Sequence, residues 1–365
     1  MRKCLFITTD IQINPQGGRE KLTKLHYDIL LELYGQRLYT FRLKERSLQR
    51  KSMIYSVLGY IDGLSITVIG QIVDFVADNG ITEVFIDGSN LGVVVDKIKK
   101  KCRHTHVYVL FHNVESRFFW GAFLENISFH SLGVLIANYF AEFYAVKSAD
   151  HIITLSKRDS LLLHRLYGRS AHSITPISLD DNFNPEYFNK EYANKKEYAL
   201  FVGGTFYANQ QGIAWFVKNV VPDIDIMICI VGKGFEDLRD KLEIPGKVEV
   251  IGTVDSLAEW YCQAKFIIAP IFDGSGMKTK VAESLMFGKK VVGTPEAFSG
   301  YEDCASIAGW CCSTVNDFIL AMNKAQKINI PQFDEHLRNI FIENYSHKAA
   351  SKRLHTILND NVLAR

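Results

Sequence analysis

The chain has 365 residues, 47% of them hydrophobic and 22% charged, with a formal net charge of +2. This length suits two domains, and the composition is typical of a globular protein rather than a disordered one. A net charge so close to zero excludes the strongly basic surface of most nucleic-acid-binding proteins. The sequence contains no run of about 18 uncharged apolar residues, so no membrane span is predicted. The seven cysteines lack Cys-x-x-Cys spacing, which indicates reduced thiols in a cytoplasmic protein.

The first half of the chain alternates short apolar runs with longer amphipathic ones. Strands are predicted at 4–9, 82–87, 106–112 and 151–155, and helices at 18–33, 65–79 and 90–101. Alternation of this kind predicts a parallel sheet with helices on both faces. Gly17-Gly18, after the first strand, could let the backbone approach a diphosphate. No Gly-x-Gly-x-x-Gly follows that strand, which argues against a nicotinamide enzyme.

The second half repeats the pattern. Strands are predicted at 198–202, 225–231, 247–251, 266–270 and 290–293, with helices at 210–218, 235–241, 256–264 and 277–287. The stretch between the halves is rich in Asp, Asn, Pro and Lys and has no periodicity, which predicts a linker. We therefore expect a domain over 1–175, a linker over 176–197, a second domain over 198–345, and a helix over 346–365 that packs back on the first domain.

Two such halves predict an α/β protein with two Rossmann-like, doubly wound domains facing across a cleft. Ligands of these folds lie beyond the carboxyl ends of the strands. The richest candidate follows the strand at 266–270, where Gly274-Ser-Gly276 opens the helix predicted from Met277. Met277, Val281 and Leu285 recur every four residues and form the expected buried stripe.

The other residues of this helix point to an anion site. The first turn of a helix offers free N–H groups and the positive end of the dipole, and Lys278 and Lys280 add charge there. Glu283 lies three residues beyond Lys280, so both side chains can reach one ligand. A phosphate near Lys280 and sugar hydroxyls near Glu283 fit this arrangement.

The stretch from Gly274 to Glu283 reads Gly-x-Gly-x-x-x-Lys-x-x-Glu and resembles the donor-site motif of retaining GT-B glycosyltransferases, family 4 and its relatives. The resemblance implies that Glu283 binds the nucleotide ribose and that Lys280 binds the donor phosphate. It also places Ser275, Gly276, Met277 and Lys278 at the donor. Many relatives carry a further glutamate that contacts the donor sugar, and Ser275 stands in its place.

Further segments resemble this family in the same order along the chain. The loops after the predicted strands of the second half then supply donor-binding residues: Gly203, Gly204, Thr205, Asn209, Gly232, Thr253 and Val254. Gly17 and Gly18 resemble the family's first glycine loop. Relatives often have an arginine where this chain has Gly204, so the resemblance leaves the phosphate charge to Lys280, with Lys278 as its neighbour.

Phe111-His-Asn-Val-Glu115 closely resembles a segment of the bacterial polysaccharide enzymes of this family. By that resemblance, His112 contacts the donor sugar and Glu115 is an acceptor-side group. The aromatic stretch Arg117-Phe-Phe-Trp120 that follows is expected to pack in the core, with a membrane-surface or lipid-acceptor contact as the alternative. Ser156 is expected to cap the next helix, with Asp159 three residues further on.

The resemblance implies a glycosyltransferase that moves a sugar from a nucleotide-diphosphate sugar to an acceptor hydroxyl, with retention and with His112, Lys280 and Glu283 as catalytic residues. No cofactor and no metal are expected, since Asp223-Ile-Asp225 lacks a second carboxylate cluster. The expected acceptor is a glycan or lipid-linked glycan of bacterial surface polysaccharide synthesis, at the inner membrane face. Alternatives are a sugar-nucleotide epimerase, a glycan phosphorylase, and a catalytically silent GT-B partner subunit.

Overall fold

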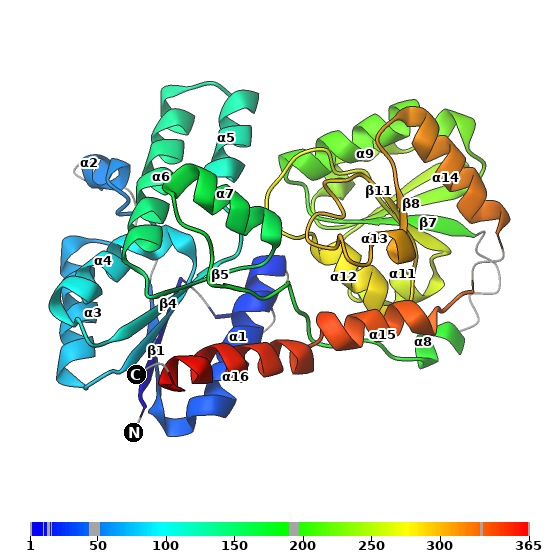
Figure 1. Cartoon of the computed structure of the whole chain (residues 1–365). Coiled ribbons are helices and arrows are strands. Elements are labelled where there is room, and N and C mark those ends of the chain that lie inside the picture. The colour runs from blue at the N-terminus through cyan, green and yellow to red at the C-terminus, as the bar shows by residue number, and fades with distance from the viewer. Residues whose placement is uncertain are drawn as a thin grey trace. The chain divides into compact units, whose positions relative to one another are not determined.

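A computed structural model gives the structure of the chain. It describes residues 2–9, 11–12, 15, 17–43, 52–189, 197–328 and 331–363. The chain forms two compact units, which we call the N-terminal unit (Met1–Ser178 with Ala350–Arg365) and the C-terminal unit (Leu179–Ala349). Figure 1 shows a sheet with helices around it in each unit.

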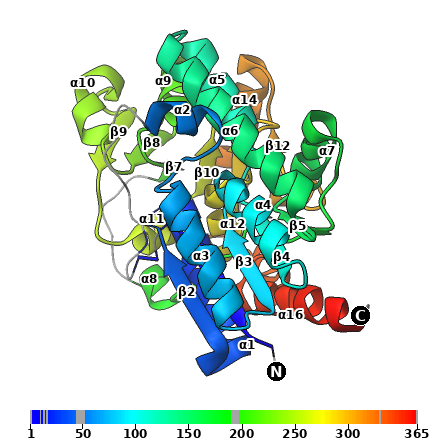
Figure 2. The same cartoon turned by 90° about the vertical axis from the view of Figure 1, so that its left-hand side faces the viewer.

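The N-terminal unit is built on a six-stranded parallel sheet in the order β2-β1-β3-β4-β5-β6. Its strands are β1 (Cys4–Thr8), β2 (Leu38–Arg42), β3 (Glu83–Asp87), β4 (His106–Phe111), β5 (His151–Thr154) and β6 (Ser173–Ile174). Every residue of β1 and β3 is buried, which is typical of a parallel sheet covered on both faces. Figure 2 shows α3 and α4 beside the strands of this sheet.

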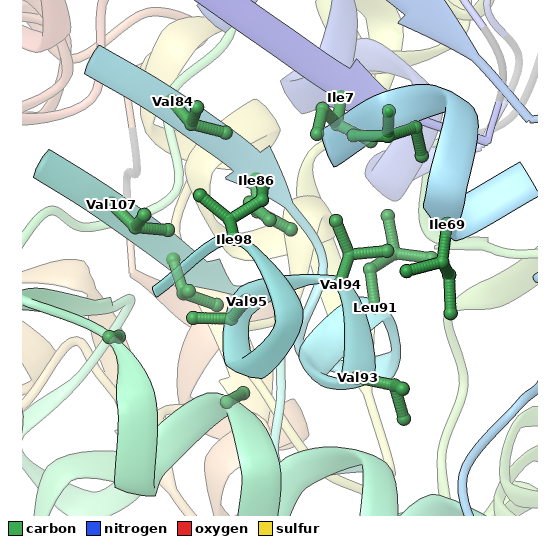
Figure 3. Close-up of a cluster of buried hydrophobic side chains, with 14 of the residues drawn as sticks. Ile7, Ile69, Val84, Ile86, Leu91, Val93, Val94, Val95, Ile98 and Val107 are labelled. Carbon is green, nitrogen blue, oxygen red and sulfur yellow. The ribbon is translucent and has the colours of Figure 1, made fainter. Parts of the chain in front are cut away.

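The helices of this unit are α1 (Gly18–Tyr34), α2 (Ser52–Val57), α3 (Ile66–Asp78), α4 (Gly92–Lys101), α5 (Glu115–Glu125), α6 (Phe129–Ser148), α7 (Lys157–Tyr167) and most of α16 (His347–Leu363), with 3-10 turns at Gly35–Arg37 and Ser89–Leu91. Figure 3 shows the core between the sheet and α4, where Val84 and Ile86 of β3 lie toward Ile98. The capping of α7 by Ser156 is confirmed, because its hydroxyl accepts the Asp159 amide at 3.1 Å.

The C-terminal unit has a second six-stranded parallel sheet, in the order β12-β11-β10-β7-β8-β9. Its strands are β7 (Tyr198–Val202), β8 (Met227–Val231), β9 (Val248–Gly252), β10 (Phe266–Ala269), β11 (Val291–Gly293) and β12 (Gly309–Cys311). Its helices are α8 (Glu186–Asn189), α9 (Tyr207–Asn219), α10 (Arg239–Leu242), α11 (Leu257–Gln263), α12 (Thr279–Met286), α13 (Ala305–Ala308), α14 (Val315–Lys327) and α15 (Glu335–Asn344), with 3-10 turns at Val221–Asp223 and Phe235–Leu238.

Several predicted bounds need correction. The helix expected from Met277 begins at Thr279, because Gly274 and Gly276 keep positive φ angles of 141° and 66° and Lys278 is still extended. The helix predicted at 235–241 is a 3-10 turn followed by the short α10. The sequence interpretation missed β2, β6 and β12, which lie at or next to the sheet edges and are short or only half-buried.

The stretch expected to be a linker contains α8, and 190–196 lie outside the described residues. The final helix, expected over 346–365, starts in the C-terminal unit and continues into the N-terminal one. There Arg2 donates to the Leu358 carbonyl at 2.9 Å, and Arg353 donates to the Ser178 hydroxyl at 3.2 Å. No helix in the described part of the chain is long and apolar enough to span a bilayer.

Each sheet contains one point at which the chain reverses its direction of progress. In the N-terminal unit β2 lies on one side of β1 and β3 on the other, and in the C-terminal unit β8 and β10 flank β7 in the same way. Loops that leave two neighbouring strands in opposite directions open a crevice at the carboxyl edge of a parallel sheet. The β1/β3 and β7/β10 strand ends are therefore the positions at which proteins with such sheets commonly bind ligands.

The fold makes a packing prediction at Gly92, the first residue of α4. A Cβ atom there would lie 1.9 Å from the Ala141 carbonyl oxygen of α6. Gly92→Ala is expected to lower the free energy of unfolding by about 1–3 kcal/mol, because the helices must separate. Gly133→Ala in α6, where no atom lies within 4 Å, is the matched control and should be neutral or stabilising. Equal melting temperatures for the two variants would contradict the close packing.

Candidate functional site

Glycines allow the backbone segments at the carboxyl edge of the C-terminal sheet to approach closely. Gly232 follows β8 with a φ of 150°, and a Cβ atom there would lie 1.7 Å from the Gly203 carbonyl oxygen. The Gly203 amide donates to Val231 at 3.1 Å, and the Gly232 amide donates to Gly252 at 2.8 Å. Both residues were expected to bind the donor, but their N–H groups donate to Val231 and Gly252 at the ends of β8 and β9. Their role in this structure is close approach of the backbones.

A hydrogen bond between Lys280 and Asn209 joins α12, which follows β10, to α9, which follows β7. Lys280 Nζ donates to Asn209 Oδ1 at 3.0 Å, while Asn209 Nδ2 donates to the Gly204 carbonyl at 2.8 Å. The ammonium also lies 4.3 Å from the ring centroid of Phe201. The sequence placed Lys280 and Asn209 at the same site, and the structure brings them into contact. Asn209 thereby ties the loop after β7 to the helix after β10.

The Lys280 ammonium is buried, with 7% of the residue exposed. Burial lowers its pKa to about 7, although the nearby Glu283 carboxylate offsets part of this effect. A cation removed from water is stabilised by an anionic partner. The site is therefore suited to an anion that would keep Lys280 charged.

Glu283 lies one turn further along α12 and is also buried. Its Oε2 accepts a hydrogen bond from the Tyr261 hydroxyl at 3.0 Å, and the Tyr261 ring stacks on Phe287 with centroids 5.1 Å apart. The predicted stripe of Met277, Val281 and Leu285 is confirmed as buried. The remaining residues of α12 from Lys280 to Met286 are buried too, so Lys280 and Glu283 do not form a solvated face.

The positive charge of Lys278, in the glycine-rich turn before α12, is paired within the protein. Lys278 Nζ donates to Glu296 Oε1 at 2.8 Å and to the Gly276 carbonyl at 3.0 Å. This ion pair leaves Lys278 a weaker candidate than Lys280 for a phosphate. The Ser275 hydroxyl oxygen is buried and has no hydrogen-bond partner among the described residues. Such a hydroxyl group is able to form a hydrogen bond with a ligand.

The other predicted donor residues lie on loops at the same sheet edge. Gly204 is exposed and has no atom near its Cβ position, and the Thr205 carbonyl accepts from Gln210 at 2.6 Å. Thr253 is exposed, and its hydroxyl donates to Glu236 at 3.1 Å. Val254 follows it and is half-buried. Parallel strands place all these loops on one edge, but no hydrogen bond links Thr253 to the Lys280 cluster in the described residues.

The N-terminal unit has a buried polar cluster at its β1/β3 crevice. His112 follows β4, and its Nε2 lies 2.9 Å from Asp87 Oδ1 at the end of β3. Asp87 Oδ2 accepts hydrogen bonds from Thr8 at 3.0 Å and Thr23 at 2.6 Å. The sequence interpretation expected His112 here but missed Asp87, Thr8 and Thr23, although the position of Asp87 at a strand end was a signal. Leaving a buried polar group unpaired costs about 1–3 kcal/mol, and these hydrogen bonds spare Asp87 that cost.

Glu115, the first residue of α5, is buried near a cation. Its Oε1 lies 3.7 Å from Arg19 Nη1 of α1. Burial raises the pKa of Glu115 to about 7, and the charge of Arg19 limits the rise. Its own amide donates to the buried carboxylate of Glu142 at 2.7 Å. Glu115 is therefore a carboxyl group that can exchange a proton near neutral pH.

The first glycine loop is a helix cap. Gly17 is the N-cap residue of α1 and its amide donates to Glu20 at 3.0 Å, while Gly18 is the first helical residue. The Gly17 N–H expected to face a phosphate is thus already paired. No group of three or more His, Cys, Asp or Glu residues that could hold a metal ion occurs within the described ranges.

Residues 196–325, within the C-terminal half, match the family described as glycosyl transferases group 1. No curated protein sequence matches the chain.

Solved structures match the chain over its whole length. HepE from Anabaena, in complex with UDP-glucose, has a TM-score of 0.67 at 13% identity, covering 99% of this chain and 100% of HepE. Sucrose-phosphate synthase from Thermosynechococcus elongatus has a TM-score of 0.75 at 12% identity, with 100% of both chains covered. The lipopolysaccharide outer core galactosyltransferase WaaB has a TM-score of 0.64 at 13% identity, covering 99% and 100%. The chain thus has the GT-B fold, with a glycosyl transferases group 1 match in its C-terminal half.

The buried ammonium makes a prediction on stability. An unfolded lysine has a pKa near 10.5. The buried Lys280 charge therefore destabilises the folded state fully below pH 7, and this destabilisation disappears as the pH rises from 7 to 10.5. Each pKa unit corresponds to about 1.4 kcal/mol. Lys280→Met should therefore stabilise the protein most at pH 6–7, with the gain shrinking toward pH 10, in urea unfolding. Lys218→Met, at an exposed position, is the control. A gain that is independent of pH would contradict the buried charge.

Proposed function

We propose that this chain is a metal-independent glycosyltransferase that moves a sugar from a nucleoside-diphosphate sugar to an acceptor hydroxyl, with retention at the anomeric carbon. The observation that carries the proposal is the Lys280–Asn209 bond at the β7/β10 crevice, next to loops lined with glycine. A buried cation at the beginning of a helix is suited to a diphosphate. The glycosyl transferases group 1 match over 196–325 supports the same assignment.

In the proposed reaction, the bond between the anomeric carbon and the leaving phosphate oxygen breaks. A bond from that carbon to the acceptor oxygen forms, and the hydroxyl proton passes to the departing diphosphate. Lys280 and the amides at the start of α12 stabilise the charge that develops on this diphosphate. Glu283 accepts hydrogen bonds from the ribose hydroxyls, with Tyr261 holding its carboxylate in place.

The nature of the donor is proposed from solved structures. HepE was solved in complex with UDP-glucose, and WaaB is a lipopolysaccharide outer core galactosyltransferase. Both support a hexose as the transferred sugar, and HepE supports UDP-glucose as the first donor to try. The WaaB match also supports an acceptor glycan of bacterial surface polysaccharide. In this proposal His112 contacts the transferred sugar, and Glu115 lies on the acceptor side.

A specific observation favours a second candidate, a catalytically silent GT-B subunit. Ser275 stands where relatives have a carboxylate for the donor sugar, and Gly204 stands where they often have an arginine. The unpartnered hydroxyl of Ser275 can take over a sugar contact, which favours the active enzyme. Thermal shift with UDP, GDP, ADP, TDP and CMP first identifies the nucleotide, since a ligand of the native state raises its stability. Release of nucleoside diphosphate that depends on an added acceptor then identifies the transferase, and binding without release identifies the silent subunit.

Glu283→Gln tests the ribose assignment. Folding should survive, because glutamine keeps the shape and can still accept from Tyr261. Affinity for the selected nucleoside diphosphate should fall by about 1.5–3 kcal/mol, the range for hydrogen bonds to a charged group. Glu335→Gln, at an exposed position of α15, is the control and should bind normally in the same calorimetric titration. Wild-type affinity of the Glu283 variant would remove Glu283 from the site.

We also propose that the α5–α6 hairpin contacts the membrane face that carries a lipid-linked acceptor. Trp120 was expected in the core, but it is 48% exposed, together with Leu124 at 56%, Ile127 at 74% and Phe129 at 96%. Exposed large apolar side chains this close together in the sequence are typical of an interaction site, and an aromatic ring beside aliphatic side chains suits the headgroup boundary of a bilayer. We call these four residues the hairpin tip.

The membrane contact predicts that the chain sediments with vesicles of phosphatidylglycerol and phosphatidylethanolamine. Replacing Leu124 and Phe129 by serine should reduce the bound fraction several-fold, because each apolar side chain buried in lipid contributes about 1.5–3 kcal/mol. Leu320→Ser, at another exposed apolar position in the C-terminal unit, is the control. Unchanged sedimentation of the double variant, or concentration-dependent dimers that the variant abolishes, would rule out the membrane contact.

A further inference from the structure

Four buried polar residues meet at the β1/β3 crevice of the N-terminal unit. Its members come from four segments: Thr8 ends β1, Thr23 lies on α1, Asp87 ends β3, and His112 follows β4. Each of the four residues is at most 8% exposed. Such a convergence at a topological switch point places polar atoms where a ligand of this fold would bind.

Asp87 is the hydrogen-bond acceptor for the other three residues of this cluster. Thr8 and Thr23 donate their hydroxyl hydrogens to Oδ2, and His112 approaches Oδ1. Burial opposes the charge, but His112 and Thr23 outweigh it and hold the pKa of Asp87 well below its usual range. The carboxylate is thus ionised and can only accept, so the hydrogen in its bond with His112 belongs to Nε2.

This bond leaves the other nitrogen of the His112 ring as the group of interest. His112 Nδ1 is buried and has no hydrogen-bond partner among the described residues. When Nε2 carries the hydrogen of a neutral imidazole, Nδ1 is a bare acceptor. A histidine whose two nitrogens differ in this way has its tautomer set by the group that holds the other nitrogen.

We propose that Asp87, steadied by Thr8 and Thr23, is a positioning residue that fixes His112 as the Nε2–H tautomer, so that Nδ1 accepts a hydrogen bond from a hydroxyl of the carbohydrate substrate. This inference rests on the proposed function and names the atom and the supporting residues through which His112 acts. Asp87, Thr8 and Thr23 do not touch the substrate in this account. They act through the orientation and tautomer of the imidazole.

The chemistry of the cluster favours a hydroxyl over other ligands. A bare nitrogen lone pair next to an ionised carboxylate repels an anion, so a phosphate oxygen is a poor partner for Nδ1. A metal ion would need further ligands, and no group of three suitable side chains exists within the described residues. A sugar hydroxyl donates one hydrogen bond without charge, which fits a single buried acceptor.

The first test reads the tautomer directly, by 15N NMR of the histidine rings in the full-length protein without ligand, with His112→Gln used to assign the signal. At pH 7.5 the expected result is a protonated Nε2 and a bare Nδ1 for His112. A protonated Nδ1, alone or in an imidazolium, would overturn the proposal. Because this measurement needs no substrate, it stands even if the proposed function fails.

The second test uses variants, with UDP-glucose as the donor probe. Asp87→Asn keeps the shape and removes the charge, so UDP release should fall by about 10-fold or more while UDP affinity stays unchanged. Thr23→Val should shift the ring signal and lower turnover, and Thr23→Ser, which keeps the hydroxyl, should restore both. Asp159→Asn removes another buried carboxylate of the same unit, at the cap of α7, and should leave turnover near that of wild type.

The two tests separate the possible failures. Equal turnover losses in the Asp87 and Asp159 variants would mean that the unit tolerates no loss of a buried carboxylate, and would overturn the positioning role. An unchanged His112 signal and turnover in Asp87→Asn would overturn it as well. If Asp87→Asn fails to fold, the Thr23 pair and the wild-type tautomer decide. Absence of binding by wild type to any of the five nucleotides would instead contradict the proposed function.

Discussion

A charge buried at the carboxyl edge of each sheet is the constraint on which both units depend. In the C-terminal unit it is the Lys280 ammonium, and in the N-terminal unit the Asp87 carboxylate. Charges are rarely removed from water without partners, because desolvation costs more than most contacts return. Asp87 has three donors around it, whereas Lys280 has the side-chain oxygen of Asn209 and the face of Phe201. The difference marks Lys280 as the group that an anionic ligand would complete.

The surrounding backbone follows from this constraint. Gly203 and Gly232 let the loops after β7 and β8 approach closely, whereas any side chain at Gly232 would overlap the Gly203 carbonyl. The sequence analysis had assigned both glycines to donor binding. In the structure their amides donate instead to the carbonyls of Val231 and Gly252. Glycine here serves the packing of the sheet edge, and the charge of the site comes from a side chain.

Much of the fold was predictable from local pattern, because buried parallel strands are continuous apolar runs and their helices are amphipathic. The placement of Lys280 and Glu283 three residues apart on one helix was also predictable, since this spacing is local information. Asp87 was missed because its meaning depends on Thr8 and His112, which are distant in sequence and meet only when β1, β3 and β4 pair. The exposure of Trp120 was missed for a related reason, since an aromatic run does not reveal whether another element covers it.

Amide hydrogen exchange of the full-length chain, with and without saturating UDP, tests the central claim that the β7/β10 crevice binds the nucleotide. Binding there should slow exchange in the peptides covering 203–209 and 274–284, because the ligand suppresses local opening of the loops that it bridges. Lys280→Met should lose most of this protection at the same UDP concentration. Protection confined to other segments, or present in full in the Lys280 variant, would contradict the account.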